Sequence, residues 1–360
     1  MGLMVMMRGK PKWSLQVIPD SQLSECLDKG SKMKAGTSSR RILAGIMANP
    51  TSFGKFKFAI EQARFYKPKG VPASELPLVQ VDKALVNAAA LMLEDVSGKV
   101  SVEVDPRAAY DTDKLVAKGL QLIALFAEIG VSKDEVLLRM PATWEAIQAA
   151  RKLELEGYAT HLVCMYSYAQ AVAAIQAGVS VIQINIGRIN DWYDKHPGVI
   201  RDPKGPREDM AMALAGYGAP LENPGLPLVR SIYNYCHQKG AKTKIIVSGM
   251  RTKNEAISLA GCDYLVIGPQ VINALKSSVT LEGYNDGLRA SEGRFESFGP
   301  SLTPENAAAS TIEELKVTEE NFNDKIGMMG RDLLQGYVDR LTADAKRLEP
   351  LLLNQAGGQE

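Results

Sequence analysis

The chain has 360 residues, of which 46% are hydrophobic and 23% are charged, a composition typical of a soluble globular protein. Its 42 basic and 41 acidic side chains give a formal net charge of +1, which offers no electrostatic case for binding nucleic acid or an anionic membrane. The four cysteines show no CxxC spacing and the histidines show no metal-ligand spacing, so no metal or cofactor is predicted. No run of about 18 apolar residues occurs, so no membrane span is predicted.

Short apolar runs typical of β-strands alternate with stretches of helical periodicity. The predicted strands cover residues 14–20, 33–38, 100–105, 136–141, 160–166, 179–186, 244–249 and 263–268. Near-continuous apolar strands, most of them followed by a helix, indicate a parallel sheet covered by helices. The count of eight strands predicts an α/β fold of the (β/α)8 barrel type, formed as a single domain by residues 1–360.

The helices between these strands have recognisable ends. Helices are predicted over residues 111–130, 143–157 and 168–178. An Asp-rich segment begins the first of them, Thr143 is expected to cap the second, and each ends at a glycine. Short polar side chains satisfy the free N–H groups at a helix N-terminus, and glycine adopts the left-handed conformation that often ends a helix.

Two segments exceed the minimal barrel. Residues 194–226 are rich in proline, glycine and charge, which predicts a long loop insertion. Residues 277–330 form a polar excursion, and the helical periodicity of residues 331–353 predicts a terminal helix that packs on the barrel.

One predicted strand contains a charge. Arg139 interrupts the apolar run 136–141, and a permanent cation in a buried strand is costly unless it is paired or used. Glu103 falls near the same end of the neighbouring predicted strand. Two interpretations of Glu103 and Arg139 stay open. They either form an ion pair that closes the top of the barrel, or they contact a ligand.

Two further arginines follow predicted strands. Arg188 comes directly after Gly187, and Arg251 comes two residues after Gly249. Functional residues of a (β/α)8 barrel lie at the carboxyl ends of its strands, and guanidinium groups bind phosphate oxygens in a fork-like geometry. The pattern predicts a phosphate monoester site, and the alternative is a pair of ordinary surface arginines.

Four long motifs carry a resemblance to a known family. The stretches "VSVEVDPRAAYDT", "MPATWEAIQAARKLELEG", "YSYAQAVAAIQAGVSVIQINIGRINDWY" and "LAGCDYLVIGP" resemble transaldolases in order and spacing, most closely the plant and plastid-type branch. The resemblance implies a (β/α)8 barrel and a class I aldolase of the pentose phosphate pathway. Such an enzyme transfers a dihydroxyacetone unit from sedoheptulose 7-phosphate to glyceraldehyde 3-phosphate through a lysine Schiff base.

The resemblance assigns roles to individual positions. It places the Schiff-base lysine at Arg139, the proton-relaying glutamate at Glu103 and the acid/base aspartate at Asp20. It places the two phosphate-binding arginines at Arg188 and Arg251. Val163 stands where the family has a threonine that holds the water of this proton relay, and Gln183 stands where it has a serine near the bound substrate. An aromatic residue, an asparagine and a proline of the family are replaced here by Asn185, Ser39 and Arg40, respectively.

These departures lead to three hypotheses. A guanidinium has a pKa above about 12 and supplies no neutral nitrogen nucleophile, so Arg139 cannot form the imine. The first hypothesis is a sugar-phosphate-binding, regulatory or structural protein without Schiff-base activity. The second hypothesis is a sugar-phosphate isomerase or lyase that uses Glu103 and Arg139. The third is an active transaldolase with a relocated lysine, for which Lys244 and Lys253 are weak candidates.

The partners and the compartment are predicted only broadly. A sugar phosphate is the expected ligand, and a homodimer or a larger protein assembly is compatible with the family. No nucleic-acid or membrane partner is expected, and the resemblance points to the cytoplasm or the plastid stroma.

Overall fold

The computed structural model describes residues 17–19, 34–196, 223–276 and 302–354. Asp20 and most of the predicted loop 194–226 therefore lie outside the described residues, as does much of the predicted excursion 277–330. The described residues fall into two compact units, each presented by itself. The first unit comprises residues 34–165, 173–182 and 334–354, and the second comprises residues 17–19, 166–172, 183–276 and 302–333.

Parallel strands form the centre of the first unit. They pair in the order β2 (Gly36–Ser38), β3 (Val100–Glu103), β4 (Val136–Pro141) and β5 (Thr160–Met165). The register places Glu103 opposite Arg139, and Arg139 opposite His161. This register brings the charged side chains of two separate sequence motifs to the same level of the sheet.

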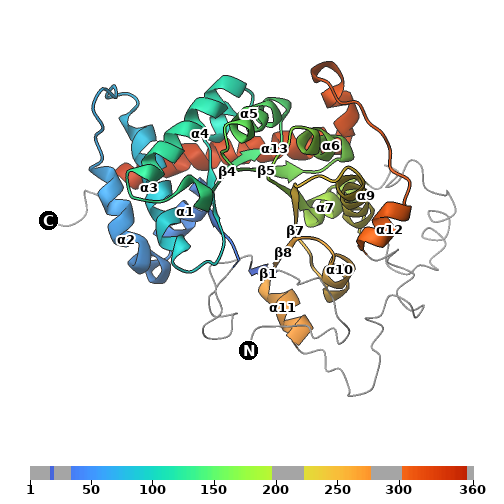
Figure 1. Ribbon diagram of the computed structural model, residues 1–360. Coiled ribbons are helices and arrows are strands. Elements are labelled where there is room, and N and C mark those ends of the chain that lie inside the picture. Colours follow the sequence, from blue (N-terminus) through green and yellow to red (C-terminus); the bar gives the residue numbers. More distant parts are fainter. Residues whose placement is uncertain (1–16, 20–33, 197–222, 277–301, 355–360) are drawn as a thin grey trace. The chain divides into compact units, whose positions relative to one another are not determined.

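Helices accompany these strands along the chain (Figure 1). They are α1 (Arg40–Ala48), α2 (Pro50–Arg64), α3 (Leu76–Leu93), the 3-10 helix η2 (Pro106–Ala108), α4 (Thr112–Ala127), the 3-10 helix η3 (Lys133–Glu135) and α5 (Trp144–Leu155). Thr143 caps α5 by accepting a hydrogen bond from the Ala146 N–H, as predicted. Gly130 and Gly157 adopt positive φ values of 77° and 80° beyond the ends of α4 and α5, which confirms their role as helix-ending glycines.

Helix α3 is the one described helix that is long and apolar enough to cross a membrane. Its apolar window is 56% buried, and the helix packs against α2 and β3 inside the first unit. Its buried side chains include the charged Asp82 and Lys83. A core helix of a globular protein passes the same test of length and composition, so α3 is weak support for a membrane span.

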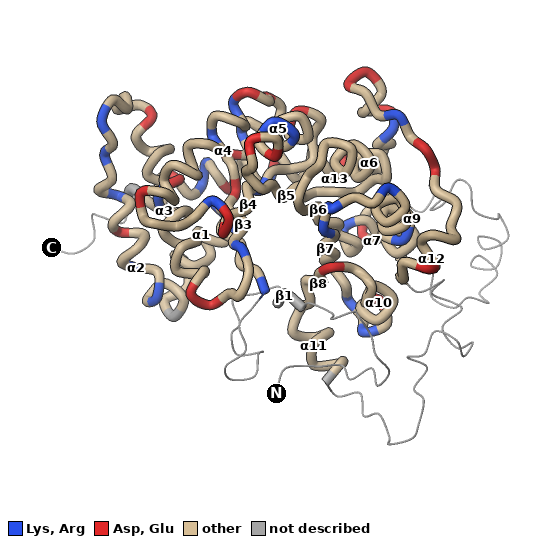
Figure 2. The backbone as a smooth tube through the Cα atoms, in the orientation of Figure 1, with Lys and Arg blue, Asp and Glu red and all other residues tan. Residues whose placement is uncertain are grey.

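The second unit repeats the pattern of parallel strands and helices. Its strands follow the order β1 (Val17–Pro19), β8 (Tyr264–Ile267), β7 (Lys244–Ser248) and β6 (Val181–Asn185), of which the first two residues of β6 belong to the first unit. Its helices are α7 (Ile186–Lys195), α9 (Gly225–Gln238), α10 (Lys253–Ser258), α11 (Pro269–Lys276) and α12 (Pro304–Ala309). Figure 2 shows acidic and basic residues interspersed along the helices of both units, in keeping with the net charge of +1.

Two helices contribute residues to both units. Helix α6 (Tyr168–Gln176) is followed by Gly178, whose φ of 75° matches the predicted helix end. Helix α13 (Glu319–Asn354) has non-helical backbone angles at Gly327, where two helical segments meet. Each predicted strand range contains one strand of the described structure. The α/β class and the barrel-like alternation of parallel strands with helices are thus confirmed, and closure into a complete eight-stranded barrel stays a prediction.

Candidate functional site

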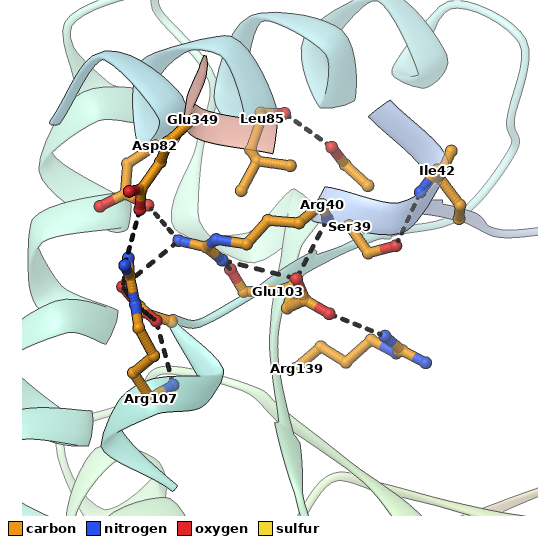
Figure 3. Close-up of polar contacts among 11 residues, drawn as sticks. Ser39, Arg40, Ile42, Asp82, Leu85, Glu103, Arg107, Arg139 and Glu349 are labelled. Carbon is orange, nitrogen blue, oxygen red and sulfur yellow. Dashed lines mark hydrogen bonds and ion pairs between the residues drawn. The ribbon is translucent and has the colours of Figure 1, made fainter. Parts of the chain in front are cut away.

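Charged side chains, four of them buried, gather in the first unit near the carboxyl ends of β2, β3 and β4 (Figure 3). We call this group the charge cluster; it consists of Arg40, Asp82, Glu103, Asp105, Arg107, Arg139 and Glu349. The carboxyl ends of parallel strands are the edge at which α/β folds place their functional residues. The cluster therefore lies where the sequence predicts the catalytic chemistry.

Arg40 lies at the centre of the charge cluster. Ser39 caps α1 by accepting a hydrogen bond from the Ile42 N–H at 3.3 Å, and Arg40 is the first residue of that helix. The Arg40 side chain is only 2% exposed, and its Nη2 donates to Asp82 Oδ1 at 2.8 Å. Its backbone N–H donates to Glu103 Oε2 at 3.0 Å, and Nη1 lies 3.5 Å from the same oxygen. A third carboxylate, that of Asp105, lies 3.7 Å from Nη2.

The burial of these groups changes their protonation equilibria. Burial by itself lowers the pKa of Arg40, but the charges of Asp82, Glu103 and Asp105 outweigh it, and the pKa is raised above its ordinary value. Burial raises the pKa of Asp82 above its ordinary value, although the Arg40 charge opposes this shift. Arg40 thus stays a cation, and its charge is what makes three neighbouring carboxylates tolerable in a buried site.

Arg139 lies on the other side of Glu103. Its Nη1 is 3.7 Å from Glu103 Oε1, and its side chain is 12% exposed. Burial lowers the pKa of Arg139, but the neighbouring Tyr337 and Glu103 outweigh burial, so the pKa is raised above its ordinary value. The predicted ion pair between Glu103 and Arg139 is present, and Arg40 is the closer partner of the same carboxylate. A cation held in this way has no lone pair with which to attack a carbonyl.

Asp105 and Arg107 form the outer part of the charge cluster. Arg107 donates from Nε and Nη2 to the Asp105 carboxylate at 2.9 and 2.6 Å, and from Nη1 to Glu349 of α13 at 2.6 Å. Burial raises the pKa of Asp105, but the hydrogen bonds from Arg107 and the Arg40 charge outweigh it, so the pKa lies below its ordinary value. Paired guanidinium and carboxylate groups of this kind fix each other's geometry. Asp105 therefore serves as a structural carboxylate of the cluster.

Two other predicted site residues of the first unit, Val163 and Ser39, are buried. Val163 is 3% exposed on β5, and its isopropyl group offers no hydrogen bond to a water molecule. Ser39 is also buried, and its hydroxyl oxygen is the cap of α1. Ser101 Oγ and His161 Nδ1 lie 2.6 Å apart in the buried interior of the same sheet. Val163 lacks the hydroxyl of the threonine, and Ser39 lacks the amide of the asparagine, that the resemblance places at these two positions.

In the second unit, Gln183 and Asn185 come from β6. Gln183 Nε2 donates to Ser248 Oγ at 3.0 Å, which links β6 to the end of β7. Asn185 caps α7, because its Oδ1 accepts a hydrogen bond from the Arg188 N–H at 3.0 Å. The cap fixes the backbone of Arg188 directly beyond the strand.

The two predicted phosphate-binding arginines emerge from adjoining backbone segments. A Cβ atom on Gly187 would lie 2.5 Å from the Gly249 carbonyl oxygen, so these two glycines permit a backbone contact that other residues would prevent. Gly249 also has a φ of 81°, which favours glycine. Arg188 follows the first glycine, and Arg251 lies two residues after the second. The structure thus brings together the parts of the chain that carry both arginines, and Asp191 Oδ1 lies 2.6 Å from Arg251 Nη2.

Sequence reasoning missed the central role of Arg40, its partner Asp82, and Asp191. A signal for Arg40 was present, because an arginine stands where the resembling family has a proline. Asp82 lies in the middle of an apolar helix, and Asp191 is one of several acidic residues on α7. Within the part of the chain that the structure describes, no group of three or more His, Cys, Asp or Glu side chains has the geometry to hold a metal ion.

Comparison with known proteins decides the family. The sequence profile of the family "Transaldolase/Fructose-6-phosphate aldolase" matches residues 27–350. The chain belongs to this family.

Curated transaldolase-family proteins show the same relationship over most of the chain. A transaldolase of Sus scrofa is 32% identical over 340 residues, which cover 93% of this chain and 90% of that protein. A probable transaldolase of Dictyostelium discoideum is 36% identical over 247 residues, which cover 68% of this chain and 72% of that protein. A transaldolase of Glaesserella parasuis is 38% identical over 218 residues, covering 61% and 64% respectively. The alignment with the Sus scrofa protein therefore spans nearly the whole chain.

Proposed function

We propose that this transaldolase-family protein binds sugar phosphates but does not form the Schiff base, and acts as a binding, regulatory or structural protein in carbohydrate metabolism of the pentose phosphate type. The observation that carries the proposal is Arg139, which stands where the resemblance places the nucleophilic lysine. Its guanidinium pairs with Glu103, and its raised pKa keeps it cationic. Without a neutral nitrogen, the addition to a ketone has no nucleophile.

The state of Glu103 supports the same proposal. One carboxylate oxygen accepts the Arg40 backbone N–H, and the other faces Arg139. The partners on its two sides thus hold this carboxylate between Arg40 and Arg139. The apolar Val163 leaves no side-chain hydroxyl to hold a relay water at its position.

Arg188 and Arg251 support binding of a phosphorylated ligand. Both follow strands of the second unit, and the contact between Gly187 and Gly249 brings their backbone segments together. Two guanidinium groups on adjoining segments suit the oxygens of a phosphate monoester. A sugar phosphate is therefore the ligand class that we propose.

The proposal extends to features that rest on the resemblance alone. These are a single closed barrel over residues 1–360, the plant and plastid-type branch, a location in the cytoplasm or the plastid stroma, and a homodimer or larger assembly. The family membership shown by residues 27–350 supports the barrel most directly.

A pair of measurements on the purified full chain tests the function. We expect fructose 6-phosphate or sedoheptulose 7-phosphate at millimolar concentration to raise the thermal unfolding temperature, because a ligand that binds only the native state stabilises it by mass action. Arg188→Ala and Arg251→Ala should each reduce that shift. Borohydride treatment with fructose 6-phosphate should trap no adduct. Transaldolase turnover by the wild-type protein would reject the proposal, and absence of any thermal shift would favour a scaffold without a ligand.

Two alternatives have their own tests. The adjacency of Glu103 and Arg139 favours an isomerase or lyase in which the guanidinium polarises a carbonyl, and proton exchange at a substrate carbon that Glu103→Gln abolishes would support it. An active transaldolase needs another lysine. Lys244 donates to Asp263 at 2.8 Å, and this hydrogen bond raises the pKa of Lys244 above its ordinary value, which opposes a nucleophilic role. Peptide mapping of a borohydride-trapped adduct would identify any lysine that does react.

A further inference from the structure

Asp191 lies at the arginine pair of the second unit and has no assigned role. It belongs to α7, three residues after Arg188, so the two side chains project from the same face of the helix. Its Oδ1 lies 2.6 Å from Arg251 Nη2. Asp191 is therefore paired with one of the proposed phosphate-binding arginines and lies next to the other along the helix.

This pairing has a consequence for any anion that approaches Arg251. The guanidinium edge that faces Asp191 already has an anionic partner, and the side chains of Arg251 and Asp191 are 54% and 37% exposed. A phosphate group that takes the same edge must displace the carboxylate and then lie close to its negative charge. Like charges a few ångströms apart repel, even when solvent screens them partly.

The opposing effect is the orientation that Asp191 gives to Arg251. A single contact between two partly exposed side chains restricts the arginine only weakly. Phosphate binding must break the Asp191–Arg251 ion pair and must overcome repulsion by the Asp191 carboxylate. Only the weak orientation of Arg251 by Asp191 favours phosphate binding. The competing role of Asp191 is therefore the stronger one.

The geometry points to Asp191 as a built-in competitor that occupies Arg251 in the absence of ligand and sets the affinity of the site for phosphorylated ligands. This inference rests on the proposed phosphate site. Asp191 acts through Arg251 and makes no contact of its own with the ligand in this proposal. It restricts binding to ligands whose anionic group outcompetes a resident carboxylate, and phosphate, with a charge between −1.5 and about −2 near pH 7, has this property.

The test compares Asp191→Asn with Asp194→Asn in the full chain. Asp194 is on the next turn of α7, and its carboxylate accepts a hydrogen bond from Asn190 at 2.9 Å. Asp194→Asn is the control because it changes the net charge by the same amount as Asp191→Asn. Titration calorimetry with inorganic phosphate and with fructose 6-phosphate gives the dissociation constants. We expect Asp191→Asn to tighten both by roughly two- to fivefold, as expected for one exposed ion pair, and Asp194→Asn to change them less. Asp191→Glu, which keeps the charge, should restore the wild-type value.

The outcomes separate this inference from the proposed function. Wild-type binding that Arg251→Ala weakens, together with unchanged or weaker binding by Asp191→Asn, would overturn the competitor role while leaving the phosphate site in place. Equal tightening by both asparagine variants would assign the effect to net charge and would also overturn it. Absence of phosphate binding by the wild type and by Asp191→Asn would reject the phosphate site itself.

Discussion

Arg139 and Glu103 face each other from adjacent parallel strands, with 3.7 Å between Nη1 and Oε1, while the other oxygen of Glu103 accepts the backbone N–H of Arg40 at 3.0 Å. The carboxylate that the resemblance assigns to proton relay is thus held between two residues that have no neutral form near pH 7. The position of the nucleophile is altered, whereas the carboxylate beside it is retained and lies between two arginines. We therefore expect that replacing Arg139 alone would not produce transaldolase activity.

Arg139→Lys should not create transaldolase activity. An amine would then be available at position 139, but Val163, Gln183 and Ser39 would still lack the groups that the resemblance assigns to the relay water and the substrate. We expect no turnover with sedoheptulose 7-phosphate and glyceraldehyde 3-phosphate, and no borohydride-trapped adduct in intact-protein mass spectra. An adduct that maps to position 139 would show that the remaining site is competent for imine formation.

Arg40→Ala should strongly destabilise the protein. Removal of the guanidinium leaves Asp82, Glu103 and Asp105 as buried carboxylates without their shared cation, and breaking a buried pair in this way costs about 3–5 kcal/mol of unfolding free energy. Urea denaturation measures the change. The matched control is Arg41→Ala, since the next arginine of α1 is exposed and its loss should cost less than about 0.5 kcal/mol. Equal effects of the two substitutions would contradict the central role of Arg40.

Asp105 should contribute to stability at neutral pH and lose that contribution in acid. Its folded-state pKa lies below the ordinary value of 3.8, so folding favours the carboxylate. The contribution is complete above the unfolded-state pKa and disappears as the pH falls through the folded-state pKa. Urea unfolding between pH 3 and pH 6 should show a decline below about pH 4 that is shallower in Asp105→Asn. Asp113→Asn, at a side chain that is 88% exposed, should keep the wild-type slope.

Gly249→Ala should disrupt the turn that precedes Arg251. A Cβ atom there would lie 2.3 Å from Asn185 Oδ1, and the φ of 81° is unfavourable for alanine. We expect a loss of about 2–4 kcal/mol in unfolding free energy from strain and overpacking, together with weaker phosphate binding. Gly268→Ala is the control, because the glycine after β8 has open space around its Cβ position. A neutral Gly249→Ala variant would contradict the described backbone contact.

The sequence predicted the secondary structure well because its signals are local. The strand ranges follow from runs of apolar residues, and Thr143 and Gly157 mark the ends of α5 by chemistry that operates within a few residues. The sites at Arg188 and Arg251 were also predicted from the glycines beside them, and their role in binding stays a prediction. The segments that carry Asp20 and most of the loop 194–226 lie outside the described residues.

By itself, the sequence determined the alternation of strands and helices, the family, and the presence of an arginine at position 139. The tertiary structure decided how that charge is accommodated. Arg40 meets Asp82 across 42 positions of sequence and Glu103 across 63, and Asp191 meets Arg251 across 60. No periodicity or local motif encodes such pairs. They arise because packing brings distant segments together and because a buried charge is stable only where a partner of opposite sign is held against it.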